Sequence, residues 1–133
     1  MAALDTNLLV RFLVQDDAAQ GEAATALIRS GIRSGHTLFV PVTVVLELEW
    51  VLRSAFGFDK AAVMHAVSRL LGSFELRFES EGAVEAALAQ YDRVPADFSD
   101  CLHAALAMQA GERPLWTFDK AASRIEGARL LTT

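Results

Sequence analysis

Five acidic side chains, at four well-separated places in the chain, stand beside short apolar segments. Asp5 lies inside the apolar run ALDTNLLV, and Asp119 directly follows LWTF. Glu47 lies within VVLELEWVL, and Asp97 and Asp100 open the segment DFSDCLHAALA. If such carboxylates meet, two of them about 4 Å apart repel by about 4 kcal/mol at an effective dielectric constant of about 20. Divalent cations that prefer oxygen ligands, Mg²⁺ or Mn²⁺, would offset that repulsion, so these residues indicate metal chemistry.

The elements that must position these acids alternate between short strands and longer helices. Strands are expected at residues 2–4, 37–40, 115–118 and 128–131, with a half-exposed edge strand at 74–78, where apolar and charged residues alternate. Apolar residues with helical spacing predict helices at 24–35, 43–56, 59–72, 80–91 and 98–110. Strands that alternate with helices indicate a parallel sheet with right-handed crossovers. We predict an α/β fold, a three-layer α/β/α sandwich, in which residues 1–133 form a single domain.

This topology brings four of the acids to one edge of the sheet. The functional crevice of an open parallel sheet lies beyond the carboxyl ends of its strands. Asp5 and Asp119 each stand at the end of a predicted strand. The helix at 98–110 leads into the fourth strand, so it begins near the carboxyl end of that strand and carries Asp97 and Asp100 there.

Glu47 is the acid that local structure explains least. It lies in the first turns of the helix at 43–56, which leaves the second strand at the same edge. Its spacing from Val44 and Val51 places it on the apolar stripe of that helix, whereas Glu49 points about 200° away around the helix. An inward carboxylate needs a partner, and no Lys or Arg occurs within three residues of Glu47. We therefore expect Glu47 to face the same cation.

The other four acids also have purely structural interpretations. Asp5 or Asn7 could cap a helix that starts near Leu8, and Asp119 could cap the short segment KAASRI. Asp97 could accept backbone N–H bonds at the start of the helix at 98–110, while Asp100 interacts with the positive end of that helix. Capping does not explain Glu47, so the set as a whole favours a metal site.

Composition limits the classes of function. A net charge of −5, from 17 acids against 12 bases, argues against a broad basic surface for nucleic acid, although most of the bases are arginines, which pair well with phosphates. The apolar stretch at 38–46 is too short to cross a bilayer, and no secretory signal precedes Arg11, so we expect a cytoplasmic protein. Cys101 is the only cysteine, which excludes an intrachain disulfide.

The segments DTN, VVLELEWVLRSAFG, ADFSDCLHAALA and TFDKAA together resemble the PIN domain, and more specifically its VapC-type bacterial toxins. The resemblance covers nearly the whole chain. It implies a five-stranded parallel sheet, metal-dependent ribonuclease activity, a homodimer, and a cognate antitoxin whose C-terminal segment covers the acidic pocket. The family pattern falls on Asp5, Glu47, Asp100 and Asp119, with Asp97 as an additional acid one helical turn before Asp100.

On this resemblance, Asp5, Asp100 and Asp119 are expected to hold Mg²⁺ or Mn²⁺ while Glu47 binds a metal or orients the attacking water. Polar neighbours of the acids are expected to fix the carboxylate rotamers, with ordinary caps and turns as the alternative: Thr6, Asn7, Ser99 and Thr117. Four bases are candidates for contact with the RNA backbone, with a solvated surface charge as the alternative role: Arg11, Arg53, Arg93 and Lys120.

Two other functions compete with the nuclease. A non-catalytic domain of the same fold, kept for binding a partner, would not need all the acids, so their complete presence favours the enzyme. A phosphatase with an aspartate nucleophile would also place a carboxylate after the first strand, but it normally needs a second acid two residues later, where Asn7 stands.

Overall fold

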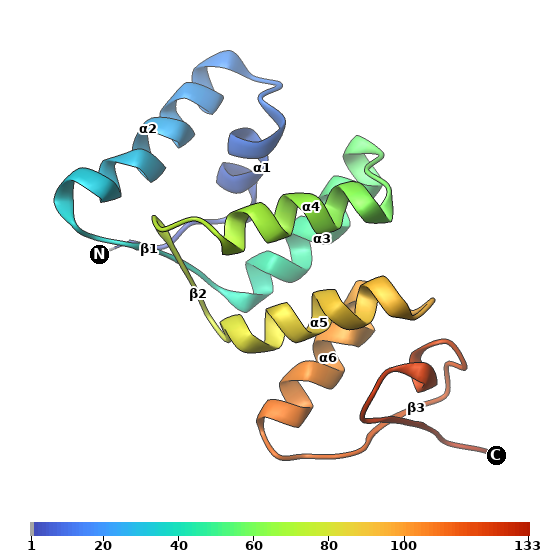
Figure 1. The fold of residues 1–133 in the computed structure, drawn as a ribbon. Coiled ribbons are helices and arrows are strands. Elements are labelled where there is room, and N and C mark those ends of the chain that lie inside the picture. The colour runs from blue at the N-terminus through green and yellow to red at the C-terminus, as the bar shows by residue number, and fades with distance from the viewer. Residues whose placement is uncertain (1) are drawn as a thin grey trace. The chain divides into compact units, whose positions relative to one another are not determined.

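The computed structural model describes residues 2–133, and the chain divides into two units, one that runs to Glu79 and one that spans Ser80–Thr133 (Figure 1). The first unit contains, in order, α1 (Thr6–Val14), α2 (Ala18–Ser34), β1 (Leu38–Val40), α3 (Val42–Phe56), α4 (Lys60–Leu71) and β2 (Leu76–Phe78). The second unit contains α5 (Glu81–Arg93), α6 (Phe98–Gln109), β3 (Leu115–Thr117), the 3₁₀ turn η1 (Ala122–Arg124) and β4 (Ala128–Leu130).

All strand pairing over residues 2–133 is parallel, as predicted. In the first unit, Ala3 bridges Phe39 of β1, and β1 pairs with β2. In the second unit, β3 pairs with β4 so that Leu115 lies opposite Ala128. The α/β class is therefore confirmed, but the chain is mostly helical. The three-layer arrangement and the single domain stay predictions.

The expected five-stranded sheet is not what the described residues form. The segment at Ala3, β1 and β2 form one set of three, and β3 and β4 form a separate pair. Each of the four named strands is only three residues long. Strands this short offer few ladder hydrogen bonds. Trp116 in β3 is 53% exposed, so β3 lacks the apolar burial on both faces that a central parallel strand shows. In the predicted edge strand, Leu76 and Phe78 are buried around exposed Arg77, whereas Phe74 lies outside β2 in a turn.

Local signals place the helix ends correctly. Gly35 and Gly57 end α2 and α3 with φ of 72° and 68°, a left-handed conformation that glycine adopts without steric cost. Asp59 begins α4, where its carboxylate accepts a hydrogen bond of 2.8 Å from the Ala62 N–H. The five predicted helices are all present, together with α1, which begins directly after Asp5.

The core of the first unit is built from apolar residues of α1, α3 and α4, including Leu9, Leu48, Leu52 and Val63, which are fully buried. The stripe predicted for α2 is only partly correct. Its buried residues are Gly21, Ala24, Ile28 and Gly31, whereas Leu27 and Ile32 are 41% and 65% exposed. The glycines allow a close approach that the hydrophobic pattern does not reveal, because a Cβ on Gly31 would lie 2.4 Å from the His36 carbonyl oxygen.

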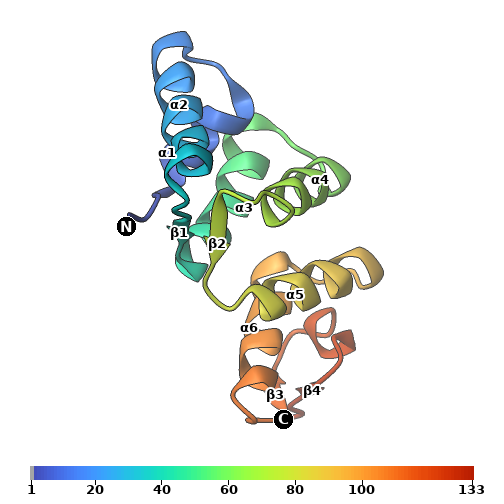
Figure 2. The same ribbon diagram turned by 60° about the vertical axis from the view of Figure 1, so that its left-hand side comes forward.

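In the second unit, α5 and α6 pack side by side (Figures 1 and 2). The predicted stripe of α5 is confirmed, since Val84, Ala87, Leu88 and Tyr91 are all buried. The ring of Tyr91 meets that of Phe98 edge to face, with 5.6 Å between the ring centroids. No helix within residues 2–133 has both the length and the apolar content needed to cross a membrane.

Candidate active site

Asp5 stands at the start of α1, where its backbone is extended and its side chain caps the helix. Its Oδ1 accepts a hydrogen bond of 2.9 Å from the Leu8 N–H, so the capping interpretation is confirmed for this residue. Asp5 is exposed, and over the described residues its second oxygen, Oδ2, has no hydrogen-bond partner. The cap therefore fixes the direction of the carboxylate and leaves one oxygen available for another ligand.

Glu47 is not the buried acid of α3, and in this respect the sequence prediction is wrong. Glu47 is exposed, whereas Glu49 is only 3% exposed and forms an ion pair of 2.8 Å with Arg53. The apolar pattern misleads because α3 carries apolar residues on nearly every side, and the face that enters the core is that of Val45, Leu48, Glu49 and Leu52.

Glu47 is nevertheless held in place by α1. The Thr6 hydroxyl donates a hydrogen bond to Glu47 Oε1, and Thr6 itself is buried, with 6% exposure. Together with Asp5, Asn7 and Val51, these two residues line a hollow of about 140 Å³. One water molecule needs only about 10–15 Å³, so the hollow has room for solvent or a hydrated ion between the carboxylates. Asp5 and Glu47, 42 positions apart in the sequence, thus line one hollow.

In the second unit, Asp119 is fixed by the turn that follows β3. Its Oδ1 accepts hydrogen bonds from the N–H groups of Ala121, at 2.7 Å, and Ala122, at 3.2 Å. The N–H of Asp119 donates to the Thr117 hydroxyl oxygen at 3.0 Å. The capping interpretation of Asp119 is therefore confirmed as well. The expected contact between Thr117 and Asp119 is present, although it involves the backbone of the acid.

Asp97 and Asp100 begin α6, but they do not act as the capping pair considered above. Asp97 occupies the position before the helix, yet its side chain accepts no backbone hydrogen bond there. It is exposed, while Asp100, in the first turn, and Ser99 are half-buried. Asp100 stands near the positive end of α6, as expected. The carboxylate of Asp97 is thus not engaged by the helix that it precedes.

The acids are divided between the units. Asp5 and Glu47 belong to the first unit, and Asp97, Asp100 and Asp119 belong to the second. Within either unit, over the residues that the structure describes, no three side chains of His, Cys, Asp or Glu are grouped closely enough to hold a metal ion. The complete set proposed from the sequence stays a prediction.

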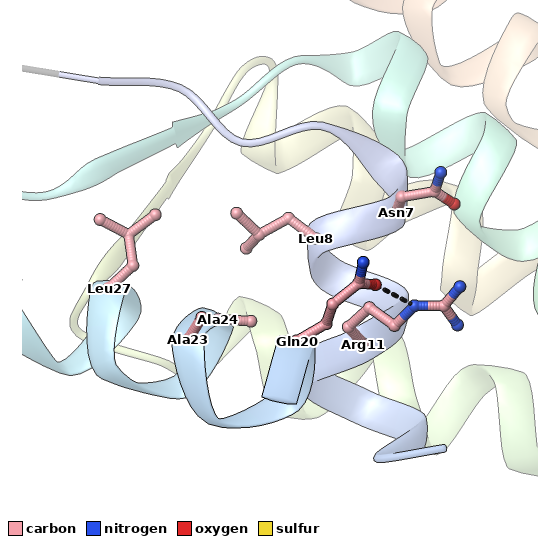
Figure 3. A pocket seen from close by; sticks show the side chains of 7 residues that line it. All are labelled: Asn7, Leu8, Arg11, Gln20, Ala23, Ala24 and Leu27. Atoms are coloured by element: carbon pink, nitrogen blue, oxygen red, sulfur yellow. Dashed lines mark hydrogen bonds between the residues drawn. The ribbon is translucent and has the colours of Figure 1, made fainter. Parts of the chain in front are cut away.

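Two of the bases selected for RNA contact already have acidic partners. Arg11 pairs with Asp16 at 2.9 Å and donates to Gln20 at 2.8 Å, beside a largely apolar pocket of about 280 Å³ between α1 and α2 (Figure 3). Arg53 pairs with Glu49. Over the described residues, the Arg93 side chain donates a hydrogen bond to the Ala89 carbonyl oxygen, at 3.3 Å, and Lys120 is exposed.

Sequence reasoning passed over Arg29 and Arg69, which line a second polar hollow in the first unit. The signal that could have selected them is the absence of Asp and Glu from the sequence on either side of each arginine, since acids are otherwise frequent in this chain.

The fold and these acids define an α/β protein with parallel strands and carboxylates at strand ends and helix starts. A family model for the PIN domain matches residues 2–128, so the chain belongs to the PIN domain family, as the acidic motifs indicated. A protein of Aquifex aeolicus (strain VF5) described as a VapC ribonuclease is 24% identical over 120 residues, which cover 90% of this chain and 88% of that protein.

Proposed function

We propose that this chain is a metal-dependent endoribonuclease of the VapC type, which hydrolyses RNA phosphodiester bonds as the toxin of a toxin–antitoxin pair. The observation that carries the proposal is the ordered set Asp5, Glu47, Asp100 and Asp119 in a chain that the PIN family model matches from residue 2 to residue 128. The similarity to a protein described as a VapC ribonuclease supports the choice of RNA as the substrate.

The donor set fits Mg²⁺ or Mn²⁺ because it consists of carboxylate oxygens, with no sulfur or imidazole ligand that would favour zinc. The hollow between Asp5 and Glu47 provides one part of such a site. When bound, a divalent cation would favour deprotonation of an attacking water and neutralise the phosphodiester oxygens.

In this proposal Asp5, Asp100 and Asp119 hold the cation, Glu47 binds it or orients the water, and Asp97 adds a further oxygen ligand. Thr6 holds Glu47 through its hydroxyl, and the cap interactions of Asp5 and Asp119 set the directions of those two carboxylates. Asn7, Ser99 and Thr117 complete the polar surroundings.

Arg93 and Lys120 remain candidates for contact with the RNA backbone, because their side chains have no carboxylate partner over the described residues. Arg11 and Arg53 are weaker candidates, since RNA would compete with Asp16 and Glu49 for them. The rest of the proposal follows the resemblance: a cytoplasmic homodimer, inhibited by a cognate antitoxin that covers the acidic pocket.

The test is cleavage of structured RNA by the purified protein with Mn²⁺, with and without EDTA, beside a generic phosphate ester. Asp5→Asn should abolish cleavage while the protein stays folded, because Asn caps a helix as well as Asp does but lacks the charge. Undiminished cleavage by this variant would overturn the assignment. Hydrolysis of the phosphate ester without RNA cleavage would favour a phosphatase, and no hydrolysis of either substrate would favour a non-catalytic partner-binding domain.

A further inference from the structure

The two arginines that sequence reasoning passed over line a hollow of about 260 Å³ in the first unit. Its walls come from the end of α1, the middle of α2 and the end of α4, with Arg29 on α2 and Arg69 on α4. None of the residues that line it is an acid. The hollow therefore concentrates two positive charges in a protein whose net charge is −5.

Both arginines are unpaired in the part of the chain that the structure describes. The ion pairs there join Arg11 to Asp16 and Arg53 to Glu49, and neither of these includes Arg29 or Arg69. The Gln15 amide donates to the Phe12 carbonyl oxygen at 2.9 Å. The guanidinium groups are thus the strongest donors in the hollow that have no acceptor of their own.

The sequence around each arginine is free of acids. No Asp or Glu occurs between Glu22 and Glu47, the stretch that contains Arg29, or between Asp59 and Glu75, the stretch that contains Arg69. Since no acid lines the hollow and neither arginine forms an ion pair over the described residues, its two positive charges have no carboxylate partner there. A ligand with negative charge would compensate them.

The hydrogen-bond donors of the hollow indicate which kind of anion it would bind. Arginine presents a planar fork of N–H groups that matches the oxygens of a phosphate, and such charge-assisted hydrogen bonds are the strong ones. The Thr25 hydroxyl accepts a long contact of 3.5 Å from Gln15, so its own hydrogen can point into the hollow as a third donor. Three donors that line one hollow suit a phosphodiester, which has two unesterified oxygens.

We propose that this hollow binds a backbone phosphate of the RNA substrate at a fixed distance from the cleaved bond, an inference that rests on the proposed nuclease function. From Asp5 to Phe12 helix α1 advances roughly 10 Å at about 1.5 Å per residue. With a rise of about 3.4 Å per stacked nucleotide, that length corresponds to about three nucleotides. The hollow therefore holds the strand a few nucleotides from the phosphate at Asp5 and Glu47, and fixes its register.

The experiment measures binding of a fluorescent single-stranded RNA of about 20 nucleotides, longer than the ~4–16 nucleotides that a single-strand binding fold typically covers. Binding is followed by anisotropy over a series of salt concentrations, in an Asp119→Asn background that does not cleave. Replacing Arg29 and Arg69 together by Ala should weaken binding about tenfold, since each charged hydrogen bond contributes strongly. It should also lower the slope of log Kd against log salt by about 0.7, the value for one lost phosphate contact.

The matched control replaces Arg33 and Arg124 together by Ala, because both are exposed and neither lines the hollow. This control removes the same net charge as the test variant. Because neither residue lines the hollow, it should leave the slope of log Kd against log salt unchanged. In the active protein, the Arg29 and Arg69 double variant should raise KM with kcat retained. Equal slopes and affinities for the two double variants would overturn the inference. Failure of the wild-type protein to cleave RNA would contradict the nuclease function instead, and the binding comparison would still decide what the hollow holds.

Discussion

At the scale of single residues, Glu47 and Glu49 provide a matched pair on one helix. Glu47→Gln should lower RNA cleavage by about 10²–10⁴-fold, the range expected when a group that handles the proton of an attacking water is lost. It should not reduce stability, because it removes a negative charge from a hollow that also contains Asp5. Cleavage rates and thermal unfolding of the purified variant check both parts.

Glu49→Gln should show the opposite behaviour. Glu49 is buried and pairs with Arg53, whose side chain is 45% exposed, so weakening this pair should cost up to about 1 kcal/mol of unfolding free energy. Cleavage should stay close to the wild-type rate because Glu49 does not line the hollow between α1 and α3. A larger loss of cleavage for Glu49→Gln than for Glu47→Gln would reverse the assignment.

Thr6 provides a second test at this scale. Thr6→Val removes the hydroxyl that donates to Glu47 and nearly preserves the shape of the side chain, so the carboxylate loses its support. Loss of such a positioning contact typically costs about 10–100-fold in metal affinity or activity. Thr6→Ser keeps the hydroxyl and should restore both. Calorimetric titration with Mn²⁺ gives a readout independent of cleavage, and an unchanged Mn²⁺ affinity in Thr6→Val would contradict the role of Thr6.

At the scale of elements, the close approach of α2 to the chain before β1 depends on Gly31. Gly31→Ala would place a Cβ 2.4 Å from the His36 carbonyl oxygen, which belongs to backbone and cannot easily move. We expect a loss of about 1–3 kcal/mol in unfolding free energy despite the better helix propensity of alanine. Urea unfolding measures this loss.

The control for this substitution is Gly82→Ala, since Gly82 lies in the first turn of α5 and a Cβ there would meet nothing within 4 Å. Alanine should leave stability unchanged or raise it by up to about 1 kcal/mol. If Gly31→Ala and Gly82→Ala had the same effect, the tight packing of α2 would be refuted.

Whether a feature could be predicted from the sequence depends on how far apart in the chain the interacting residues lie. The caps at Gly35, Gly57 and Asp59 depend on neighbours within a few residues, and the sequence predicted them correctly. The buried face of α3 depends on its packing partners. Because this helix is apolar on most sides, the sequence pattern predicted Glu47 as the inward acid, whereas the buried acid is Glu49. Likewise, whether five short strands join in one sheet depends on long-range pairing that no local pattern encodes.

In the candidate site, too, local features could be predicted from the sequence and contacts between distant residues could not. The residue types and chain order of the acids could be read from the sequence, in which Asp5 and Asp119 directly follow apolar segments that predict strands. The contact between Thr6 and Glu47 spans 41 positions and comes only from the packing of α1 on α3. Arg29 and Arg69 are 40 positions apart, and nothing in the chain order shows that they line one hollow.

At the scale of the whole molecule, the acids of the proposed metal site come from both units of the chain, Asp5 and Glu47 from the first and Asp97, Asp100 and Asp119 from the second. A ligand that binds only the folded protein stabilises it, by about 2.7 kcal/mol when its concentration is a hundred times Kd. Mn²⁺ should therefore raise the Tm of the wild-type protein. Asp5→Asn and Asp119→Asn should each remove most of that shift, although they alter different units and both keep an oxygen that can cap.

Asp92→Asn is the control for this prediction, because Asp92 is exposed on α5, outside the acidic set, and its replacement removes the same charge. It should keep the full Mn²⁺ shift, which separates binding at the proposed site from general attraction of cations to a chain with a net charge of −5. If all three variants kept the shift, Mn²⁺ would bind elsewhere. If only Asp5→Asn lost it, the first unit would bind the cation without Asp119. Loss of the shift in both Asp5→Asn and Asp119→Asn is the expected result, because the proposed ligand set includes both carboxylates.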